Sequence, residues 1–453
     1  MNTQTLNRKV LGASSKLIYD RAVGVLTGGV SRNTIFRKPH PYYAASAKGS
    51  FIKDIDGIER LDFANNMASL IHGHSHPAIV NAITEQLQKG TAFTMGSESE
   101  VAFAELLTNR TPAFEKIRFM NSGTEAVMTM IKASRAFTGK SKIAKAEGAY
   151  HGTYDYAEIS QTADPSNWGD INTPNAVPVV QGTPKGVLED VLIYPFNDIE
   201  STLHILDQNA DQIACVLVDP VPHRVGLFPA NEAFIKALYN WTRKNNAILA
   251  FDEVVTYRVN YSGAQQNYAV KPDLTAMGKI IGGGFPIGAL AGKAEIMEVL
   301  DPRQKVLRHP HSGTFSANPV SMTAGRVAME MYDAQAVLRL NALTMTARKQ
   351  IEAAIKIADV PVCITGSGSM FRLHFREKAP NTYRDAYQSK DTKAVISELD
   401  DYLFLKERII MINTMACMFA TSLTQKDIDR LSEALLSGLR IMKPKIEQLS
   451  EKN

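Results

Sequence analysis

Residues 214–221 read ACVLVDPV, residues 234–246 read FIKALYNWTRKNN, and residues 247–255 read AILAFDEVV. The first and third segments are continuous apolar runs, which are typical of strands buried on both faces of a parallel sheet. The segment between them carries apolar residues at helical spacing and predicts the helix that joins the two strands. The order strand, helix, strand therefore predicts an α/β sheet domain.

The same alternation extends through residues 66–325, which we expect to form one large, mainly parallel domain. KIRFMNS (116–122) and SKIAKAEG (141–148) are strand-like runs on either side of the helical EAVMTMIKASRAFTG (125–139). The stretch 160–186 is rich in Pro, Gly, Asn and Asp and predicts a long irregular loop. Ligands of such sheets bind at the carboxyl ends of the strands, so functional groups are expected in the loops that follow them.

Both ends of the chain predict a smaller α/β domain beside the large one. Residues 1–65 contain a helical opening and a hairpin in FIKDIDGIERLDFA (51–64), where an Asp-Gly pair marks the turn. Residues 326–453 contain longer helices, interrupted by the strand-like runs SGSMFRLHF (367–375) and IIMINTMACMFATS (409–422).

Composition excludes several classes of function. The net charge of +4, with 45% hydrophobic and 21% charged residues, is ordinary for a globular protein and gives no basic block for nucleic acid. No apolar run reaches the roughly 18 residues of a membrane span, and the N-terminal MNTQTLNRKVLG has no signal-peptide core. Cys215, Cys363 and Cys417 lack metal-site spacing. We therefore expect a cytoplasmic protein with no metal, membrane or nucleic-acid partner.

Two charged residues stand where a sheet domain places its chemistry. Asp252 ends the run AILAF, and such an acid can partner a protonated cofactor ring, bind the metal of a P-loop ATPase, or be structural. The ATPase reading requires G-x-x-x-x-G-K-[ST], and SRAFTGKS (134–141) lacks the first glycine. Lys279 lies between a short apolar segment and three glycines (282–284). A buried lysine supplies the neutral amine of a Schiff base, whereas a lysine in this motif alone is more often a surface residue before a flexible turn.

A phosphate site is predicted where NSGTEA (121–126) follows a strand and opens a helix. Ser122 and Thr124 offer hydroxyl groups, Gly123 permits a tight turn, and the first amides of the helix favour a dianion. An N-cap alone would explain one hydroxyl and leave the second unexplained.

Two further loops carry small polar or aromatic residues. In GAYHG (148–152) the ring of Tyr150, next to His151, can stack on a flat heteroaromatic ring or serve packing alone. In HSGTFS (311–316), Thr314 belongs to a second loop suited to a phosphate.

Taken together, the motifs resemble the class III, fold-type I aminotransferases that depend on pyridoxal 5′-phosphate (PLP). The resemblance is strongest to the subgroup of glutamate-1-semialdehyde aminomutase and the β-amino-acid aminotransferases. It runs over nearly the whole chain, through TGGVSRNTIF (27–36), HGHSHPAI (72–79), NSGTEA (121–126), GAYHG (148–152), FDEVVTYR (251–258), MGKIIGGGFPIGAL (277–290) and HSGTFSANPVSMTAG (311–325).

The resemblance implies a role for each matched residue. Lys279 would hold PLP as an internal aldimine and move protons once released, and Asp252 would charge the pyridine nitrogen. Thr314 would reach the phosphate from a neighbouring subunit, which implies a homodimer with shared active sites. The implied cofactor-binding set is Ser122, Gly123, Thr124, Tyr150, His151, Asp252, Val254, Lys279 and Thr314, with Val254 and Tyr150 against the two ring faces.

Substrate choice rests on Arg32, which the resemblance implies binds the substrate carboxylate and which is otherwise a solvated loop charge. The expected activity moves the amine of a β- or ω-amino acid to a 2-oxo acid. The alternatives are the intramolecular shift of glutamate-1-semialdehyde 2,1-aminomutase and a catalytically silent protein of the same fold.

The sequence departs from the family pattern in two places. The run 409–422 has no arginine for the carboxylate of a 2-oxo acid, which weakens the case for 2-oxoglutarate as acceptor. Asp219, His223 and Arg224 stand where relatives more often have Glu-Pro and small residues. Arg224 is either a second carboxylate site or a salt-bridged loop residue.

Overall fold

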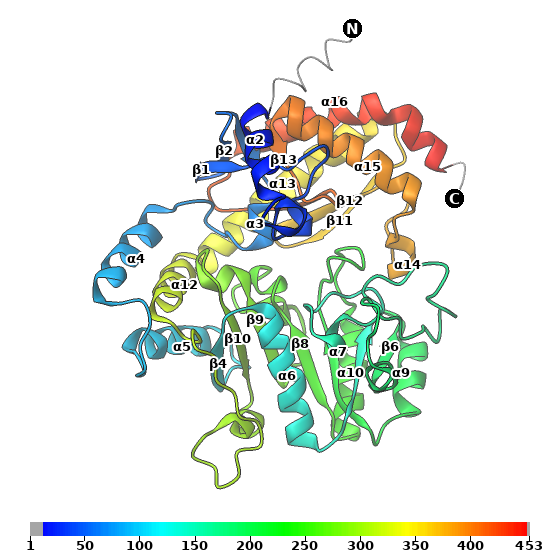
Figure 1. Cartoon of the computed structure of the whole chain (residues 1–453). Helices are drawn as coiled ribbons and strands as arrows, with labels where there is room; N and C mark the ends of the chain where they lie inside the picture. Colours follow the sequence, from blue (N-terminus) through cyan, green and yellow to red (C-terminus); the bar gives the residue numbers. More distant parts are fainter. Residues whose placement is uncertain (1–11, 451–453) are drawn as a thin grey trace.

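The computed structural model describes residues 12–450, so the N-terminal residues 1–11 that contributed to the expected cytoplasmic location lie outside the described part. A seven-stranded sheet forms the centre of the large domain (Figure 1). Its strands are, in spatial order, β4 (Lys116–Met120), β10 (Gly288–Gly292), β9 (Leu274–Gly278), β8 (Ile248–Asp252), β7 (Ile213–Val218), β5 (Lys142–Ala146) and β6 (Val191–Tyr194).

The sheet is mainly parallel, as the sequence predicts, but β10 runs antiparallel to both of its neighbours. Strands β9 and β10 flank the segment that contains Lys279 and the three glycines. Small residues allow β10 to lie close to the chain around it. A Cβ atom on Gly288 would lie 2.0 Å from the backbone oxygen of Ser122.

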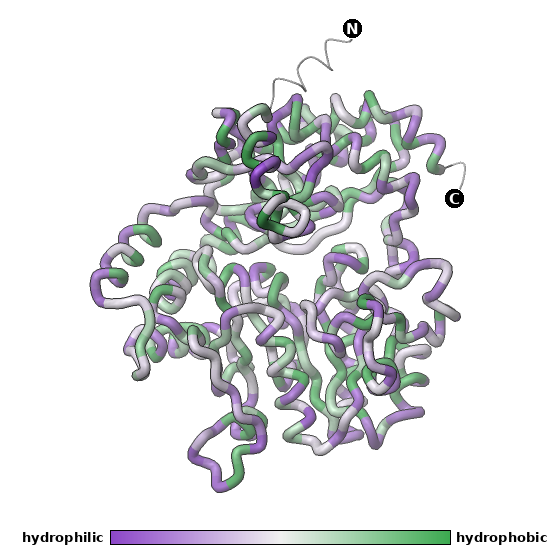
Figure 2. The backbone as a smooth tube through the Cα atoms, viewed as in Figure 1, coloured by the Kyte–Doolittle hydropathy of each residue, from purple (hydrophilic) through white to green (hydrophobic). Residues whose placement is uncertain are grey.

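Helices cover both faces of this sheet, and the buried residues of its strands alternate between them. Cys215 and Leu217 of β7 pack in the core that includes α6 (Gly123–Thr138). Val216 and Val218 of the same strand pack in the core that includes α10 (Glu232–Lys244). Every residue of β7 and β8 is buried, which explains their continuous apolar runs (Figure 2).

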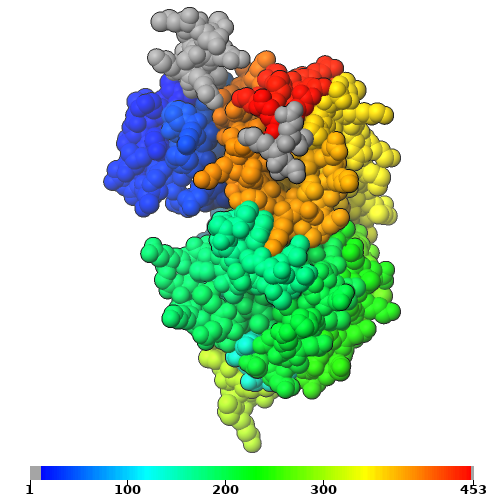
Figure 3. Space-filling view, turned by 90° about the vertical axis from the view of Figure 1, so that its right-hand side faces the viewer, coloured from blue at the N-terminus to red at the C-terminus, as the bar shows by residue number. Residues whose placement is uncertain are grey.

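The smaller α/β domain contains residues from both ends of the chain. Strand β13 (Ile409–Ile410) pairs in parallel with β3 (Glu59–Asp62), so an N-terminal and a C-terminal segment share one sheet. Figure 3 shows these two segments side by side. The other elements are β1 (Ala44–Lys48), β2 (Phe51–Asp54), β11 (Cys363–Ser367), β12 (Met370–His374), β14 (Ala416–Met418), α2 (Ala13–Ala22), α13 (Ala334–Ala358), α15 (Lys390–Tyr402) and α16 (Gln425–Ser450).

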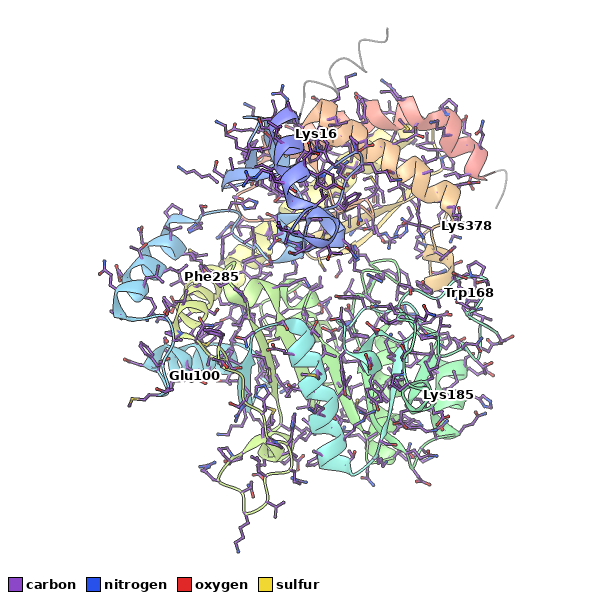
Figure 4. The ribbon with its side chains drawn as sticks, in the orientation of Figure 1. Lys16, Glu100, Trp168, Lys185, Phe285 and Lys378 are labelled. Carbon is purple, nitrogen blue, oxygen red and sulfur yellow. The ribbon has the colours of Figure 1, made fainter. Side chains whose placement is uncertain are left out.

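The long irregular loop packs against the C-terminal part of the chain. Trp168 of this loop is labelled in Figure 4 next to helix α14 (Tyr383–Ala386). The guanidinium of Arg384 lies 4.7 Å from the centre of the Trp168 ring and pairs with Glu147 at 3.0 Å. The loop therefore links the two domains.

Residues 12–450 contain neither a candidate membrane span nor a candidate metal site. None of the described helices is long and apolar enough to cross a membrane. The described side chains form no group of three or more His, Cys, Asp or Glu that could hold a metal ion. The three cysteines are free.

Candidate active site

The predicted site residues meet in a cavity of about 360 Å³ at the carboxyl ends of β7, β8 and β9. Phe285, which also lines it, lies on the face of the large domain that is turned toward the small domain (Figure 4). Eight of the nine residues expected to bind the cofactor line this cavity: Ser122, Gly123, Thr124, Tyr150, His151, Asp252, Val254 and Lys279.

Asp252 ends β8 and is held by two hydrogen bonds. Its Oδ2 atom lies 2.7 Å from Nδ1 of His151, and its Oδ1 atom accepts from the backbone nitrogen of Val254 at 2.9 Å. His151 is 2% exposed, and burial lowers its pKa, so the imidazole is neutral and its Nδ1 atom carries the donated hydrogen. The Nε2 atom is buried without a partner among the described residues.

Lys279 follows β9 directly and has a backbone φ of 49°, which is uncommon for a residue with a side chain. Burial lowers the pKa of its amine, while the nearby charges of Asp252 and Asp219 raise it. Arg32 lowers it further. A lysine with a lowered pKa has a larger fraction of the neutral amine, which is the nucleophilic form.

Ser122 is the N-cap of α6 and also lines the cavity. Its Oγ atom accepts from the backbone nitrogen of Glu125 at 3.1 Å. Thr124 also lines the cavity, and a Cβ atom on Gly152 would lie 2.6 Å from its Oγ1 atom. A Cβ atom on Gly123 would lie 2.7 Å from Cγ1 of Val254. The two glycines therefore allow the helix N-terminus, the hydroxyl groups and Val254 to meet in one tight cup.

Of the loops that carry Tyr150 and Thr314, only the first contributes its residue to the cavity. Tyr150 lines the cavity with 40% of its surface exposed, which leaves a ring face for a ligand. Thr314 is exposed and does not line the cavity of its own chain. Its neighbour Phe315 is 60% exposed.

Arg32 lies in the wall of a second cavity of about 1110 Å³. Its Nη1 atom donates to Oδ1 of Asn66 at 2.6 Å. Asn66 and Gly284 line both cavities, so the two spaces adjoin. The described residues contain no ion-pair partner for Arg32. Its charge is therefore available to an anion at the junction.

Two residues of the site were not identified as functional from the sequence. Asp219 follows β7, is 7% exposed and lines the smaller cavity. Burial and the nearby negative charge of Asp252 raise its pKa well above the ordinary value. The sequence did carry a signal for Asp219, because this acid follows an apolar run in VLVDP as Asp252 does in AFDEV. Asn66, with a φ of 47°, gave no sequence signal.

Comparison with known proteins identifies the family. The model of the aminotransferase class-III family matches residues 35–435. The chain belongs to this family. A glutamate-1-semialdehyde 2,1-aminomutase from Methanothermobacter thermautotrophicus is 36% identical over 94% of this chain and 99% of its own length.

Solved structures of the family agree with the fold. An ω-transaminase from Sphaerobacter thermophilus superposes with a TM-score of 0.92 at 43% identity, covering 95% of this chain and 98% of its own. A β-phenylalanine aminotransferase from Variovorax paradoxus gives 0.85 at 29% identity, with 96% of each chain covered. The α/β fold of this aminotransferase is therefore that of the fold-type I PLP enzymes.

The cofactor of this class III aminotransferase is PLP, and the cavity fits it. The glycine-lined cup at the N-terminus of α6 suits a phosphate dianion. Asp252 would supply the acid that a protonated pyridine nitrogen requires, and Lys279 would supply the amine that anchors the aldehyde. These residues would hold the cofactor.

Proposed function

We propose that this enzyme is a transaminase that moves the amino group of a β- or ω-amino acid to a 2-oxo acid. The observation that carries the proposal is the position of Arg32 at the junction of the two cavities. An amino acid whose carboxylate pairs with Arg32 reaches toward Lys279 with its other end. That arrangement favours a donor in which the amine is separated from the carboxylate.

The larger cavity supports a donor with an apolar part. Its wall includes Phe36, Met67 and Leu70. Arg32 supplies the anion contact, since a guanidinium forms two parallel hydrogen bonds to a carboxylate. The cation matches the carboxylate of such a molecule, and the apolar wall matches its apolar part.

In this proposal Lys279 and the polar residues around it each have a role in the reaction. Bound PLP supplies an electron-withdrawing ring that stabilises negative charge at the substrate carbon. Asp252 keeps the ring nitrogen protonated, and His151 fixes the orientation of Asp252. The Nζ atom of Lys279 would carry a proton at the substrate carbon.

The proposed enzyme acts as a homodimer in the cytoplasm. Thr314 and the adjacent Phe315 are exposed on the isolated chain, which leaves them able to enter the site of a second copy. The three free cysteines fit a reducing compartment. Residues 1–65 and 326–453 would form the small domain of each subunit, and residues 66–325 the large one.

Absorbance spectroscopy tests the proposal. The holoenzyme is mixed with α-, β- and ω-amino acids without any acceptor, and the visible band of the bound cofactor is followed. We expect β- or ω-amino acids to remove the band in one turnover. Lys279→Ala should lack this response and lose activity by at least about 10²-fold to 10⁴-fold, the range of general acid-base catalysis. A band that no donor changes would contradict the proposal.

The second candidate is a glutamate-1-semialdehyde 2,1-aminomutase, favoured by the relative that carries this name at 36% identity. An aminomutase keeps the nitrogen within one molecule and needs no oxo acid. Incubation with glutamate-1-semialdehyde alone would then yield 5-aminolaevulinate continuously. A transaminase under the same conditions stops after one turnover.

A further inference from the structure

Arg224 lacks the carboxylate partner that a loop arginine usually has. It lies in the loop after β7, and its Nη1 atom donates only to the backbone oxygen of Gln161, at 3.4 Å. Its guanidinium carbon lies 4.8 Å from the centre of the Tyr150 ring. Among the residues that the structure describes, Arg224 forms no ion pair. The salt-bridged interpretation of this residue is therefore not supported.

A second unpaired arginine lies close by and adds to the positive charge. Arg372 of β12 is 3% exposed and donates through Nη1 to the backbone oxygen of His223 at 3.0 Å. Its Nε atom is buried without a partner within residues 12–450. Burial, then the charges of Arg372 and Arg224, lower the pKa of His223 to about 3, so this imidazole is neutral. Neither guanidinium group therefore has a neutralising carboxylate among the described residues.

This cationic group contacts one residue in the lining of each cavity. Tyr150, on which Arg224 stacks, lines the smaller cavity together with Lys279. His223 Nε2 lies 3.1 Å from Oγ1 of Thr414, and Thr414 lines the larger cavity together with Arg32. Thr414 belongs to the C-terminal run that has no arginine of its own. The loop after β7 supplies positive charge to the same region.

We propose that Arg224 binds one carboxylate of a dicarboxylic 2-oxo acid that serves as the amino acceptor, while Arg32 binds the other. This inference rests on the proposed transaminase function and makes it more specific. A monocarboxylic donor uses Arg32 alone, whereas a dicarboxylic acceptor uses both cations. Two separate guanidinium groups therefore allow one site to accept substrates of different charge.

The acceptor half-reaction tests this assignment. Enzyme that has been aminated with a donor and freed of it is mixed with 2-oxoglutarate or with pyruvate, and recovery of the visible band is timed. Wild type should prefer 2-oxoglutarate. In Arg224→Ala the ratio of the two second-order rate constants should fall by about 10-fold to 100-fold, the usual effect of removing a charged hydrogen bond. The ratio for Arg224→Lys should lie between the ratios for wild type and Arg224→Ala.

Arg348→Ala is the matched control. Arg348 is also half-buried, and its Nη1 atom also donates to one backbone oxygen, that of Gly366, at 3.4 Å. Its hydrogen-bond partner Gly366 lines neither cavity, whereas the ring of Tyr150, on which Arg224 stacks, lines the smaller one, so Arg348→Ala should leave the acceptor ratio unchanged. A similar fall in both alanine variants would mean that the effect is structural and would overturn the assignment.

A binding measurement keeps the assignment testable if Arg224→Ala does not fold. Glutarate should inhibit the wild-type reaction with 2-oxoglutarate at least about 10-fold better than butyrate, because it has a carboxylate for each cation. Equal inhibition, or faster reaction of wild type with pyruvate, would overturn the assignment. Failure of the proposed function looks different, since no β- or ω-amino acid would then aminate the wild-type enzyme.

Discussion

His151 Nδ1 and Asp252 Oδ2 lie 2.7 Å apart in a buried pair at the carboxyl end of β8. The neutral imidazole donates to the carboxylate and fixes its plane without cancelling its charge. In the proposed enzyme, Asp252 would offer its negative charge to the ring nitrogen of PLP. His151 would then be a positioning residue, because it acts through Asp252.

Asp252→Asn removes the negative charge at this position and keeps the shape of the side chain. Asparagine keeps the volume but cannot hold the ring nitrogen protonated, so we expect kcat to fall by about 10²-fold or more. The protein should still bind PLP through Lys279, which the visible band reports. Wild-type kcat in Asp252→Asn would contradict the assigned role.

His151→Asn should have a smaller effect in the same assay. The shorter side chain loses the fixed hydrogen bond and leaves the charge of Asp252 in place, so a fall in kcat of about 10-fold is expected. The pH dependence of the visible band should change with it, because the orientation of Asp252 affects the ring nitrogen. A change in thermal stability without a change in that pH dependence would indicate a structural role only.

Gly123→Ala should weaken binding of PLP. The added Cβ atom would lie 2.7 Å from Cγ1 of Val254, and this overpacking distorts the phosphate cup by an amount that we expect to cost about 10-fold or more in affinity. Val254→Ala removes the clashing atoms, so the double variant should bind PLP more tightly than Gly123→Ala does. The dissociation constant of PLP, measured by fluorescence, checks this. Additive losses would show that the two sites do not interact.

The effect of Arg32→Ala on KM should depend on whether the amino donor carries a carboxylate. For amino acids that carry a carboxylate we expect KM to rise by about 10-fold to 100-fold, because the charged hydrogen bonds are lost. Amines without a carboxylate provide the internal control, since their KM should change little. An equal change in KM for both classes of donor would show that Arg32 does not bind the substrate carboxylate.

Lys145 gives a prediction for stability against pH. Its Nζ atom donates to the backbone oxygen of Ala149 at 2.9 Å, and burial, then the charge of Arg224, lower its pKa to about 7. Between this value and the ordinary pKa of about 10.4, the unfolded chain binds more protons than the folded one. Stability should therefore rise with pH in this window, by at most about 1.4 kcal/mol per pH unit from this residue.

Lys145→Met isolates that contribution. The difference in the free energy of unfolding, wild type minus variant, should increase from pH 7 to pH 10 in urea titrations. The contribution is fully present above the unfolded pKa and is lost as the pH falls through about 7. A difference that does not depend on pH would show that the lysine is protonated in the folded protein throughout this range.

Much of the fold could be predicted because local sequence patterns reflect burial. The continuous apolar runs of β7 and β8 correspond to strands that are buried on both faces. The antiparallel direction of β10 could not be predicted in this way. It is defined by the pairing of β10 with β4, a distant segment of the chain, and with β9.

In the site, too, local patterns predicted some features, whereas contacts between distant segments could not be predicted. The sequence placed Asp252 and Lys279 at strand ends, and the structure brings both into one cavity. The contact of His151 with Asp252 joins segments 101 residues apart, so spacing along the chain carried no signal for it. The exposure of Thr314 also lies beyond local pattern, because its proposed site is on another copy of the chain.

Transfer of labelled nitrogen tests the central claim most directly. The holoenzyme is incubated with a ¹⁵N-labelled β-amino acid and an unlabelled 2-oxo acid, and the new amino acid is analysed by mass spectrometry. The proposed transaminase should produce an amino acid from the acceptor that carries one ¹⁵N atom. No labelled product with any β- or ω-amino acid, together with isomerisation of glutamate-1-semialdehyde in the absence of an acceptor, would contradict the claim and identify an aminomutase.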